Sequence, residues 1–472
     1  MDNARKSELI SDDKKFVWHP FTQMADWQKD VPGKPLVIDS AKGNYLYDID
    51  GNKYLDGVSS LWVTLHGHGK KEIDAAISKQ LRKVSHSTFL GLTHQPAIEL
   101  AKKLVSLMPK GISKVFYSDN GSTAVEVALK MSYQFWSQSG RKNRNKFLSL
   151  RNAYHGDTIG SVSVGGIELF HSKFKSLLSE TLFAPTPYCY RCPKRRKKNI
   201  FFQKAATFSE HCRNVGCEGE CIAGVESILR KYGKEISAAI VEPMIQAAAG
   251  MITFPTGYLK EFERLCRKYG TLLICDEVAT GFGRTGSMFA IEHENIRPDF
   301  ICLAKGITGG YLPLAATLTT QRIFDAFLGK YEEYKTFFHG HTYTANPLAC
   351  SAAIANLEIF RNEHVISKLQ PKIKRLAREL GRMKAMRWVG DIRQLGLMAG
   401  IELVKNNLTG EDFDVELNVG AKVCEICRKK GLIIRPLGNI IVFMPPLSIT
   451  GNEITKMVSV VEESIAEQCE NL

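Results

Sequence analysis

Two short apolar runs, each meeting a charged residue, constrain the fold of this chain more than any other feature. One covers residues 272–278 and contains Asp276. The other covers residues 303–310, where Lys305 stands 29 positions after Asp276 among three glycines. Each run has the length and composition of a buried strand. In an α/β sheet, both charged side chains would lie near the carboxyl ends of strands, where such folds build their sites.

An amine and a carboxylate delivered in this way suit pyridoxal 5'-phosphate (PLP). The lysine can hold the cofactor covalently, and the carboxylate keeps the pyridine nitrogen protonated, so that the ring accepts electrons. Two alternatives stay open at this point. An apolar run ending in Asp-Glu is also typical of the magnesium-binding strand of P-loop ATPases, although the chain has no G-x-x-x-x-G-K-[ST] loop. A lysine after a strand is also common in solvated loops.

Strand-like and helical patterns alternate along most of the chain. Apolar residues at helical spacing, as in residues 73–81, lie between strand-like runs. This alternation predicts an α/β fold with a large, mainly parallel sheet covered by helices, followed by a smaller α+β domain. The predicted parts are an N-terminal segment joining the small domain (1–70), a large PLP-binding domain (71–344) with a cysteine-rich insertion (about 186–222), and a C-terminal small domain (345–472).

Five ordered segments resemble the class III aminotransferases, which are PLP enzymes of fold type I. They are residues 116–122 (FYSDNGS), 151–158 (RNAYHGDT), 276–286, 303–310 and 339–347 (HGHTYTANP). The resemblance covers nearly the whole chain, and five matches in one order are highly specific. It implies the fold type I architecture, transaminase activity and PLP as the cofactor.

The N-terminal region carries a narrower resemblance. Residues 18–24 (WHPFTQM) are similar to the opening signature of the diaminopelargonate aminotransferases, a biotin-pathway branch of this family. These enzymes convert 8-amino-7-oxononanoate (KAPA) into 7,8-diaminononanoate. The resemblance therefore implies KAPA as the amino acceptor. The alternative is another class III transaminase that acts on an ω-amino acid, of the ornithine or 4-aminobutyrate type, and the signature speaks against it.

The resemblance also implies cofactor contacts beside the catalytic pair, Lys305 and Asp276. Gly121 and Ser122 follow a strand and open a helix, where backbone N–H groups and the helix dipole favour an anion. The plain alternative for this turn is a serine N-cap. By resemblance, the two residues bind the cofactor phosphate and Tyr154 covers the cofactor ring.

Substrate contacts and a second subunit follow from the same resemblance. A guanidinium binds a carboxylate bidentately, and Arg435 matches the residue that binds the substrate carboxylate in this family. Without the resemblance, Arg435 is equally a surface arginine before a proline turn. Thr342 matches the position of a threonine that, in this family, contacts the cofactor phosphate of the other subunit. The resemblance therefore implies a homodimer with shared active sites. The implied substrate-binding set is Phe21, Trp62, Tyr154, Gly340 and Arg435.

The amino donor is predicted to be lysine or S-adenosylmethionine. The usual donor of the branch is S-adenosylmethionine, and a smaller group uses lysine. Residues 165–171 resemble the lysine group, and fewer aromatic contacts would weaken the binding of a sulfonium and an adenine. On the sequence alone, lysine is therefore preferred. The departures from the adenosyl-donor pattern are Phe21, Leu61, His341 and Val442.

The charge balance and hydropathy indicate which kinds of binding partner to expect. A formal net charge of +14 can indicate nucleic-acid binding, but most basic residues are dispersed at spacings typical of exposed helix faces. We expect small-molecule substrates and no nucleic acid. The chain contains no run of 18 or more apolar residues, so no membrane-spanning helix is expected. The first fifteen residues are charged and do not resemble a secretory signal. These features predict a cytoplasmic enzyme without membrane contact.

Five of the twelve cysteines fall in the insertion. Cys189-x2-Cys192 and Cys217-x3-Cys221 form a four-thiolate set with spacing suited to a structural zinc ion. An iron–sulfur cluster, or a cysteine-rich loop that binds nothing, would also account for the pattern. Because residues 194–198 in the same loop are all basic, a zinc-loop nucleic-acid-binding protein is a remote alternative function.

Overall fold

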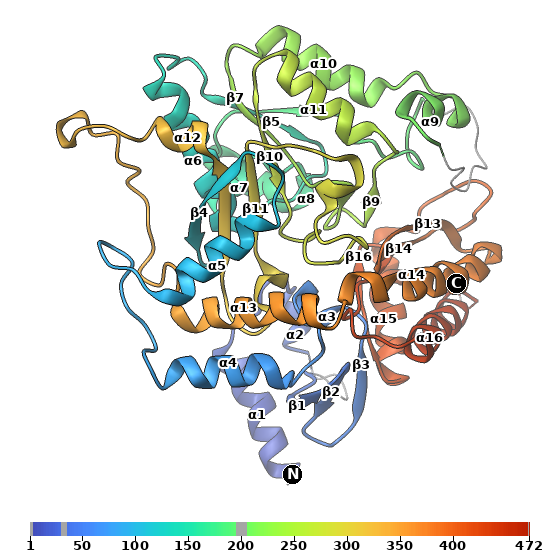
Figure 1. Ribbon diagram of the computed structural model, residues 1–472. Coiled ribbons are helices and arrows are strands. Elements are labelled where there is room, and N and C mark those ends of the chain that lie inside the picture. Colours follow the sequence, from blue (N-terminus) through green and yellow to red (C-terminus); the bar gives the residue numbers. More distant parts are fainter. Residues whose placement is uncertain (1–2, 30–34, 195–204, 471) are drawn as a thin grey trace.

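A seven-stranded sheet forms the centre of the molecule (Figure 1). The computed structural model describes residues 3–29, 35–194, 205–470 and 472. The strands lie in the order β4-β12-β11-β10-β7-β5-β6; β12 is antiparallel to both neighbours, and the other adjacent pairs are parallel. The mainly parallel sheet predicted from the sequence is therefore confirmed. The strands are β4 (Ile112–Ser118), β5 (Lys146–Leu150), β6 (Thr181–Ala184), β7 (Ile236–Val241), β10 (Leu272–Asp276), β11 (Phe300–Leu303) and β12 (Ala315–Thr320).

Helices cover both faces of this sheet, which explains why its central strands are apolar throughout. Every residue of β7 and β10 is buried. Alternate residues point to opposite faces: Ile240 and Ile274 pack with α6 (Gly121–Gln138), whereas Ala239 and Leu273 join the core that contains Phe262 of α11 (Tyr258–Lys268). A strand buried on both faces loses the alternation of polar and apolar residues.

Further helices complete the two layers. α13 packs against α4 and α5, and α10 packs against α11. Asn120 caps α6 by accepting a hydrogen bond from the Thr123 N–H, and this fixes the first turn of the helix. The other helices of this part are α4 (Lys71–Leu81), α5 (Gln95–Ser106), α7 (Ile159–Ser163), α8 (Glu168–His171), α10 (Glu220–Tyr232), α12 (Gln321–Asp325) and α13 (Pro347–Asn362).

The two ends of the chain meet in one four-stranded sheet. Strand β15 (Leu432–Ile433), near the C-terminus, pairs in parallel with β3 (Lys53–Asp56), which continues a meander of β1 (Ile38–Lys42) and β2 (Tyr45–Asp48). The N-terminal helices are α1 (Asn3–Phe16), α2 (Met24–Trp27) and α3 (Ser59–Trp62). Strand pairing thus ties residues 38–56 to the C-terminal region, while the division at residues 70 and 344 stays a prediction.

A second four-stranded sheet, in the order β13-β14-β17-β16, belongs to the C-terminal region alone. Its strands are β13 (Val389–Leu395), β14 (Met398–Leu403), β16 (Arg435–Leu437) and β17 (Ile440–Phe443). The accompanying helices are α14 (Val365–Arg382), α15 (Val419–Lys429) and α16 (Gly451–Cys469). A short hairpin elsewhere pairs β8 (Ile245–Gln246) with β9 (Ile252–Thr253). Among the helices in the described ranges, none is long and apolar enough to cross a membrane.

The cysteine-rich insertion contacts this C-terminal sheet. It contains α9 (Phe208–Val215), which Figure 1 shows at the upper right, above β13 and β14. Arg191 donates to Glu402 of β14 over 2.6 Å, and Arg393 of β13 donates to the Tyr188 hydroxyl over 3.0 Å. Of the basic run 194–198, only Lys194 falls within the described residues.

Candidate active site

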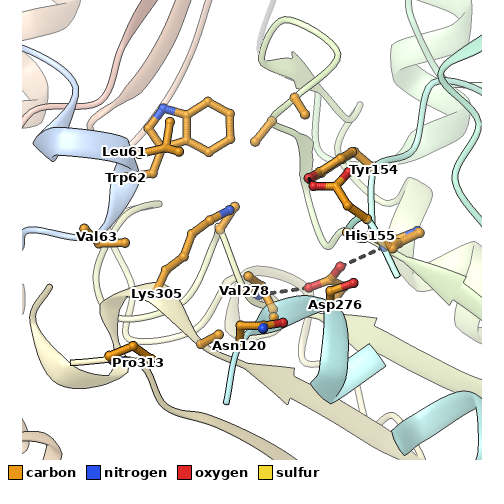
Figure 2. Close-up of a pocket in the computed structure, with 18 of the residues that line it drawn as sticks. Leu61, Trp62, Val63, Asn120, Tyr154, His155, Asp276, Val278, Lys305 and Pro313 are labelled. Carbon is orange, nitrogen blue, oxygen red and sulfur yellow. Dashed lines mark hydrogen bonds and ion pairs between the residues drawn. The ribbon is translucent and has the colours of Figure 1, made fainter. Parts of the chain in front are cut away.

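A cavity of about 740 Å³ lies at the carboxyl ends of β10 and β11 (Figure 2). β10 ends at Asp276, and Lys305 follows two residues after the end of β11. The two strands are parallel neighbours, so that both side chains enter one cavity. Eight of the site residues predicted from the sequence line it: Phe21, Trp62, Gly121, Ser122, Tyr154, Asp276, Lys305 and Arg435.

Lys305 extends into the cavity between Trp62 and Asp276 (Figure 2). Its φ of 45° is in the left-handed region, a conformation that costs a lysine free energy and that clusters at functional sites. Its Nζ lies 4.9 Å from the centre of the Trp62 ring. Burial lowers the pKa of the Lys305 amine below its usual range, because desolvation disfavours the charged form. The amine is therefore a better nucleophile and proton acceptor near neutral pH.

Asp276 is held in place by two hydrogen bonds. The imidazole Nδ1 of His155 lies 2.7 Å from one carboxylate oxygen, and the Val278 N–H donates to the other over 3.0 Å. Asp276 and His155 are only 4% and 3% exposed. A carboxylate fixed in this way keeps its charge pointed at one place in the cavity, which suits an ionic partner such as a protonated ring nitrogen.

The N-terminal end of α6 forms another part of the cavity wall. Gly121 and Ser122 occupy the first turn, where backbone N–H groups have no partner within the helix. A Cβ on Gly121 would stand 2.5 Å from the Val278 side chain, so only glycine allows this close packing. The Ser122 Oγ accepts a hydrogen bond from the Thr158 N–H over 2.9 Å. A helix N-terminus beside the cavity is a suitable site for a phosphate group.

These side chains fit PLP. The amine of Lys305 and the carboxylate of Asp276 face the same cavity, and the anion-binding helix terminus lines it as well. Tyr154 adds an aromatic face to the same wall. Five of the six residues predicted to bind the cofactor therefore line one cavity, and Thr342 does not.

Aromatic rings line the cavity near Tyr154. The Tyr154 hydroxyl donates to Asp157 over 2.8 Å, and the ring centre of Phe170 lies 6.2 Å from that of Tyr154. Phe21 meets Phe170 edge to face at 5.5 Å. Phe21, Phe170 and Tyr154 thus form a continuous aromatic surface in the cavity lining.

Glu242 lies beneath this aromatic wall and is 4% exposed. Its carboxylate accepts hydrogen bonds from the Tyr154 N–H at 3.1 Å and the Ala247 N–H at 3.0 Å. Burial, with a smaller contribution from the charge of Asp276, raises the pKa of Glu242 to about 7. In this conformation the Glu242 carboxylate holds the backbone at Tyr154.

Arg435 and Trp62 line a part of the cavity that also has apolar residues. Arg435 begins β16, and Leu61, Val63 and Leu437 lie in the same lining. Trp62 has a φ of 65°, and its buried Nε1 has no hydrogen-bond partner within the described part of the chain. A cation beside apolar side chains suits a ligand that carries a carboxylate on a hydrocarbon chain.

Two predicted site residues, Gly340 and Thr342, do not line this cavity. They are exposed in a segment where His341 forms an ion pair with Asp119 at 2.8 Å. Val442, one of the positions used to judge the donor, is buried in β17 opposite Arg435 and does not line the cavity either. Of the four donor positions, Phe21 and Leu61 lie in the cavity lining.

The sequence reasoning missed His155, Asp157 and Phe170 as site residues. His155 and Asp157 belong to the segment RNAYHGDT, so their place beside Tyr154 was the available signal. Phe170 gave no such signal, because its contact with Phe21 bridges 149 positions of the chain.

The four cysteines of the predicted metal site lie elsewhere. Cys189, Cys192, Cys217 and Cys221 line a separate cavity of about 30 Å³, together with Cys212. No disulfide joins the twelve cysteines, all of which are in the described residues.

Comparisons with known proteins show the family to which this chain belongs. The aminotransferase class-III family model matches residues 27–465. A protein of Geobacter sulfurreducens named adenosylmethionine-8-amino-7-oxononanoate aminotransferase is 48% identical over 453 residues, 96% of each chain. A protein of Aquifex aeolicus with the same name is 50% identical over 455 residues, again 96% of each chain.

Solved structures show the same fold. The crystal structure of adenosylmethionine-8-amino-7-oxononanoate aminotransferase from Methanocaldococcus jannaschii has a TM-score of 0.90 and 46% identity, and the match covers 98% of this chain and 99% of that one. An amine transaminase from an uncultivated Pseudomonas species, solved in its PLP-bound form, has a TM-score of 0.85 and 36% identity, covering 96% and 99%. The chain therefore belongs to the class-III aminotransferases and has the fold type I architecture.

Proposed function

We propose that this chain is a PLP-dependent transaminase of the biotin pathway that converts KAPA into 7,8-diaminononanoate. The observation that carries the proposal is the cavity in which Lys305 and Asp276 converge beside the N-terminal end of α6. The named relatives, at 48–50% identity over 96% of each chain, support KAPA as the acceptor. PLP, when bound, supplies an aldehyde that takes up an amino group and a ring that accepts electrons.

The residues of the chain divide the work of the reaction among them. Lys305 would hold the cofactor through Nζ, and the same amine, when free, would move a proton at the reacting carbon. Asp276 keeps the pyridine nitrogen charged, while His155 and the Val278 N–H prevent the carboxylate from turning away. Gly121 and Ser122 bind the phosphate, and Tyr154 covers the ring.

The chemistry of KAPA supports the role proposed for Arg435. KAPA has a carboxylate at one end of a hydrocarbon chain and its reacting carbonyl near the other end. Apolar side chains such as Leu61 and Leu437 suit the chain, and the guanidinium of Arg435 suits the carboxylate. Trp62, whose ring is 4.9 Å from Lys305 Nζ, would pack against the substrate near the reacting carbon.

Replacing Arg435 by alanine is expected to weaken KAPA binding. Loss of a charge-assisted contact with a carboxylate costs on the order of 2–4 kcal/mol, or roughly 30- to 1,000-fold. The expected signature is a higher KM for KAPA with a much smaller change in the donor half-reaction. Steady-state kinetics with KAPA varied, beside stopped-flow of the donor half-reaction, would measure both.

Arg378→Ala is the matched control for this variant. Arg378 is an exposed arginine of α14, outside the cavity lining, and its loss should leave both half-reactions unchanged. Equal losses in the two half-reactions of Arg435→Ala would contradict the carboxylate role and make Arg435 a structural residue.

Two amino donors are supported by different observations. The aromatic surface of Phe21, Tyr154 and Phe170 suits the sulfonium and adenine of S-adenosylmethionine. The names of the relatives, which include adenosylmethionine, also support this donor. Asp157, which lines the cavity, offers the acidic end that the remote ammonium of lysine requires. Because His341 and Val442 do not line the cavity, the sequence-based preference for lysine loses two of its arguments. We propose S-adenosylmethionine first and lysine second.

A half-reaction assay decides between these donors. The PLP-loaded enzyme is mixed with each donor separately, and the change in cofactor absorbance is followed before KAPA is added. Rapid conversion by S-adenosylmethionine, followed by formation of 7,8-diaminononanoate, is the expected result. If only lysine converts the cofactor, the donor assignment changes to lysine and the assignment of KAPA as the acceptor stands.

The same assay tests the acceptor against the alternative class III activity. Ornithine and 4-aminobutyrate serve as parallel donors, since an ω-transaminase from Pseudomonas jessenii also resembles this fold, with a TM-score of 0.89 at 29% identity. Turnover with these amines and none with KAPA would overturn the biotin-pathway assignment.

A homodimer with shared active sites is part of the proposal. Thr342 is exposed, and its neighbours Phe338 and Tyr343 are 73% and 62% exposed despite their large apolar rings. Leu90, at 90% exposure, lies in an adjoining loop that the His86–Tyr343 ring contact links to the same surface. Large exposed apolar residues of this kind mark protein interfaces, and burying them would bring Thr342 against a second subunit.

We also propose a cytoplasmic location. No disulfide joins the twelve cysteines, all of which lie in the described residues, and this suits a reducing compartment.

A further inference from the structure

A second cavity, separate from the active site, is lined by thiols. It has a volume of about 30 Å³ and shares no lining residue with the larger cavity. Five cysteines and one histidine reach it from three consecutive parts of the insertion: the turn before the basic run, α9, and the start of α10. These side chains, here called the thiol cluster, are Cys189, Cys192, His211, Cys212, Cys217 and Cys221.

Two backbone turns bring the thiols together. The Cys192 N–H donates to the Cys189 carbonyl at 3.4 Å, and the Cys217 N–H donates to the Cys212 carbonyl at 2.9 Å. Gly216, which caps α9 with a φ of 69°, directs the chain back toward the cavity. The first turn therefore brings Cys189 to the cavity, and the second brings Cys212 and Cys217 to it.

One hydrogen-bond contact within the thiol cluster involves its histidine. Cys189 Sγ lies 3.3 Å from His211 Nε2. An imidazole N–H at this distance can donate to a metal-bound thiolate and orient it, as the groups around structural metal ligands do. A cavity of about 30 Å³ has room for a single ion at the centre of the thiol cluster.

The thiol cluster differs from the other cysteines of the chain, because five thiols line one cavity. The other seven cysteines of the chain are buried within the hydrophobic core, where a thiol behaves as a small hydrophobe. Converging thiols gain nothing from one another as hydrophobes, whereas a soft cation binds several of them at once.

We propose that the insertion binds one zinc ion through Cys189, Cys212, Cys217 and Cys221, with His211 donating a hydrogen bond to the Cys189 sulfur. This set replaces Cys192 of the spacing-based prediction by Cys212, which is 7% exposed and packs against Cys217. Zinc binding displaces the four thiol protons to solvent. The N-terminal end of α10, in which Cys221 is the second residue, favours the resulting negative charge.

Binding requires the side chains to close in. In the described part of the chain, no group of three or more His, Cys, Asp or Glu side chains is already arranged around a metal position. A cysteine side chain moves its sulfur through rotation about χ1 alone, so a rotamer change can draw the thiols inward without moving the backbone.

The position of the thiol cluster assigns the ion a structural role. The same insertion anchors the C-terminal sheet through Arg191 and Glu402, and Tyr188, which lines the cavity, accepts a hydrogen bond from Arg393. An ion at the cluster would hold this contact in place. Loss of the ion should therefore lower Tm while the active-site residues remain intact.

Metal analysis of the PLP-loaded enzyme, purified without chelator, tests the proposal. About one zinc per chain is expected, falling to near zero in a Cys189→Ser/Cys212→Ser variant. Cys469→Ser, the same change at a buried cysteine of α16, is the matched control and should keep the zinc. Cys192→Ser should also keep it. Zinc lost from Cys192→Ser but kept in Cys212→Ser would overturn the proposed ligand set.

A second measurement does not depend on the folding of any variant. Chelator-treated wild-type enzyme is titrated with Co²⁺ and then with Zn²⁺. Thiolate-to-cobalt charge-transfer bands of a tetrahedral site, abolished by one equivalent of Zn²⁺, are expected. Enzyme that is metal-free as purified and gives no such bands would overturn the proposal, as would iron with acid-labile sulfide in place of zinc.

Discussion

Lys305→Ala is expected to lose the covalent attachment of PLP and nearly all turnover. Lys305 is the lysine that lines the 740 Å³ cavity, and burial lowers the pKa of its amine. General acid–base catalysis alone is worth about 10²–10⁴-fold, and covalent catalysis is lost with it. The rate of the overall reaction should fall by roughly 10⁴-fold or more. Borohydride reduction followed by peptide mass spectrometry would show cofactor on residue 305 in the wild type and none in the variant.

Lys305→Arg separates a chemical role from an electrostatic one. Arginine keeps the positive charge beside Asp276 but is not deprotonated in proteins, so it cannot hold the cofactor or move the proton. It should be as inactive as the alanine variant. Substantial activity in Lys305→Arg, or trapped cofactor on a different lysine, would refute the assignment of Lys305.

Asp276→Asn is expected to leave PLP bound but to slow the chemistry strongly. A carboxylate raises the pKa of an adjacent cation by about 1–3 units, so its loss reduces the protonated fraction of the pyridine nitrogen by roughly 10- to 1,000-fold. The corresponding increase in the barrier is about 1.4–4 kcal/mol. Single-turnover kinetics of the donor half-reaction would measure it directly, with cofactor content determined separately.

The geometry around residue 276 makes this substitution a clean one. An asparagine oxygen can still accept the hydrogen bond from His155 Nδ1 at 2.7 Å, so the side chain need not turn. Asp276→Glu, which restores the charge, should recover part of the rate. A near-normal rate in Asp276→Asn would show that another group protonates the ring.

The core sheet and the convergence of Lys305 and Asp276 on one cavity could be predicted because their signals are local. β10 and β11 are apolar runs in which every residue is buried, and a run of this kind marks a strand covered on both faces. Parallel strands place their carboxyl ends on one edge of the sheet. The nearness of Asp276 and Lys305 therefore followed from two segments of sequence, without knowledge of the strand order.

Partners brought together from distant segments could not be predicted in this way. His155 reaches Asp276 across 121 positions, and it does so because β5, which precedes it, and β10 are both neighbours of β7. Val442 was expected near the donor, yet β17 is hydrogen-bonded to strands on both sides and buries this side chain in the core. That Val442 is a valine does not tell whether its side chain points into the cavity or into the core.

The cysteine-rich insertion shows the same division between sequence and structure. Its spacing indicated that thiols would gather, because residues a few positions apart in a turn must lie close together. Spacing alone could not bring in Cys212 or His211, whose direction depends on how α9 packs beside the turn at residues 189–192. Local pattern thus determined the strands, the catalytic lysine and carboxylate, and the presence of a thiol-rich segment. Tertiary packing decided which side chains meet there, because contacts between distant segments depend on strand order and helix placement.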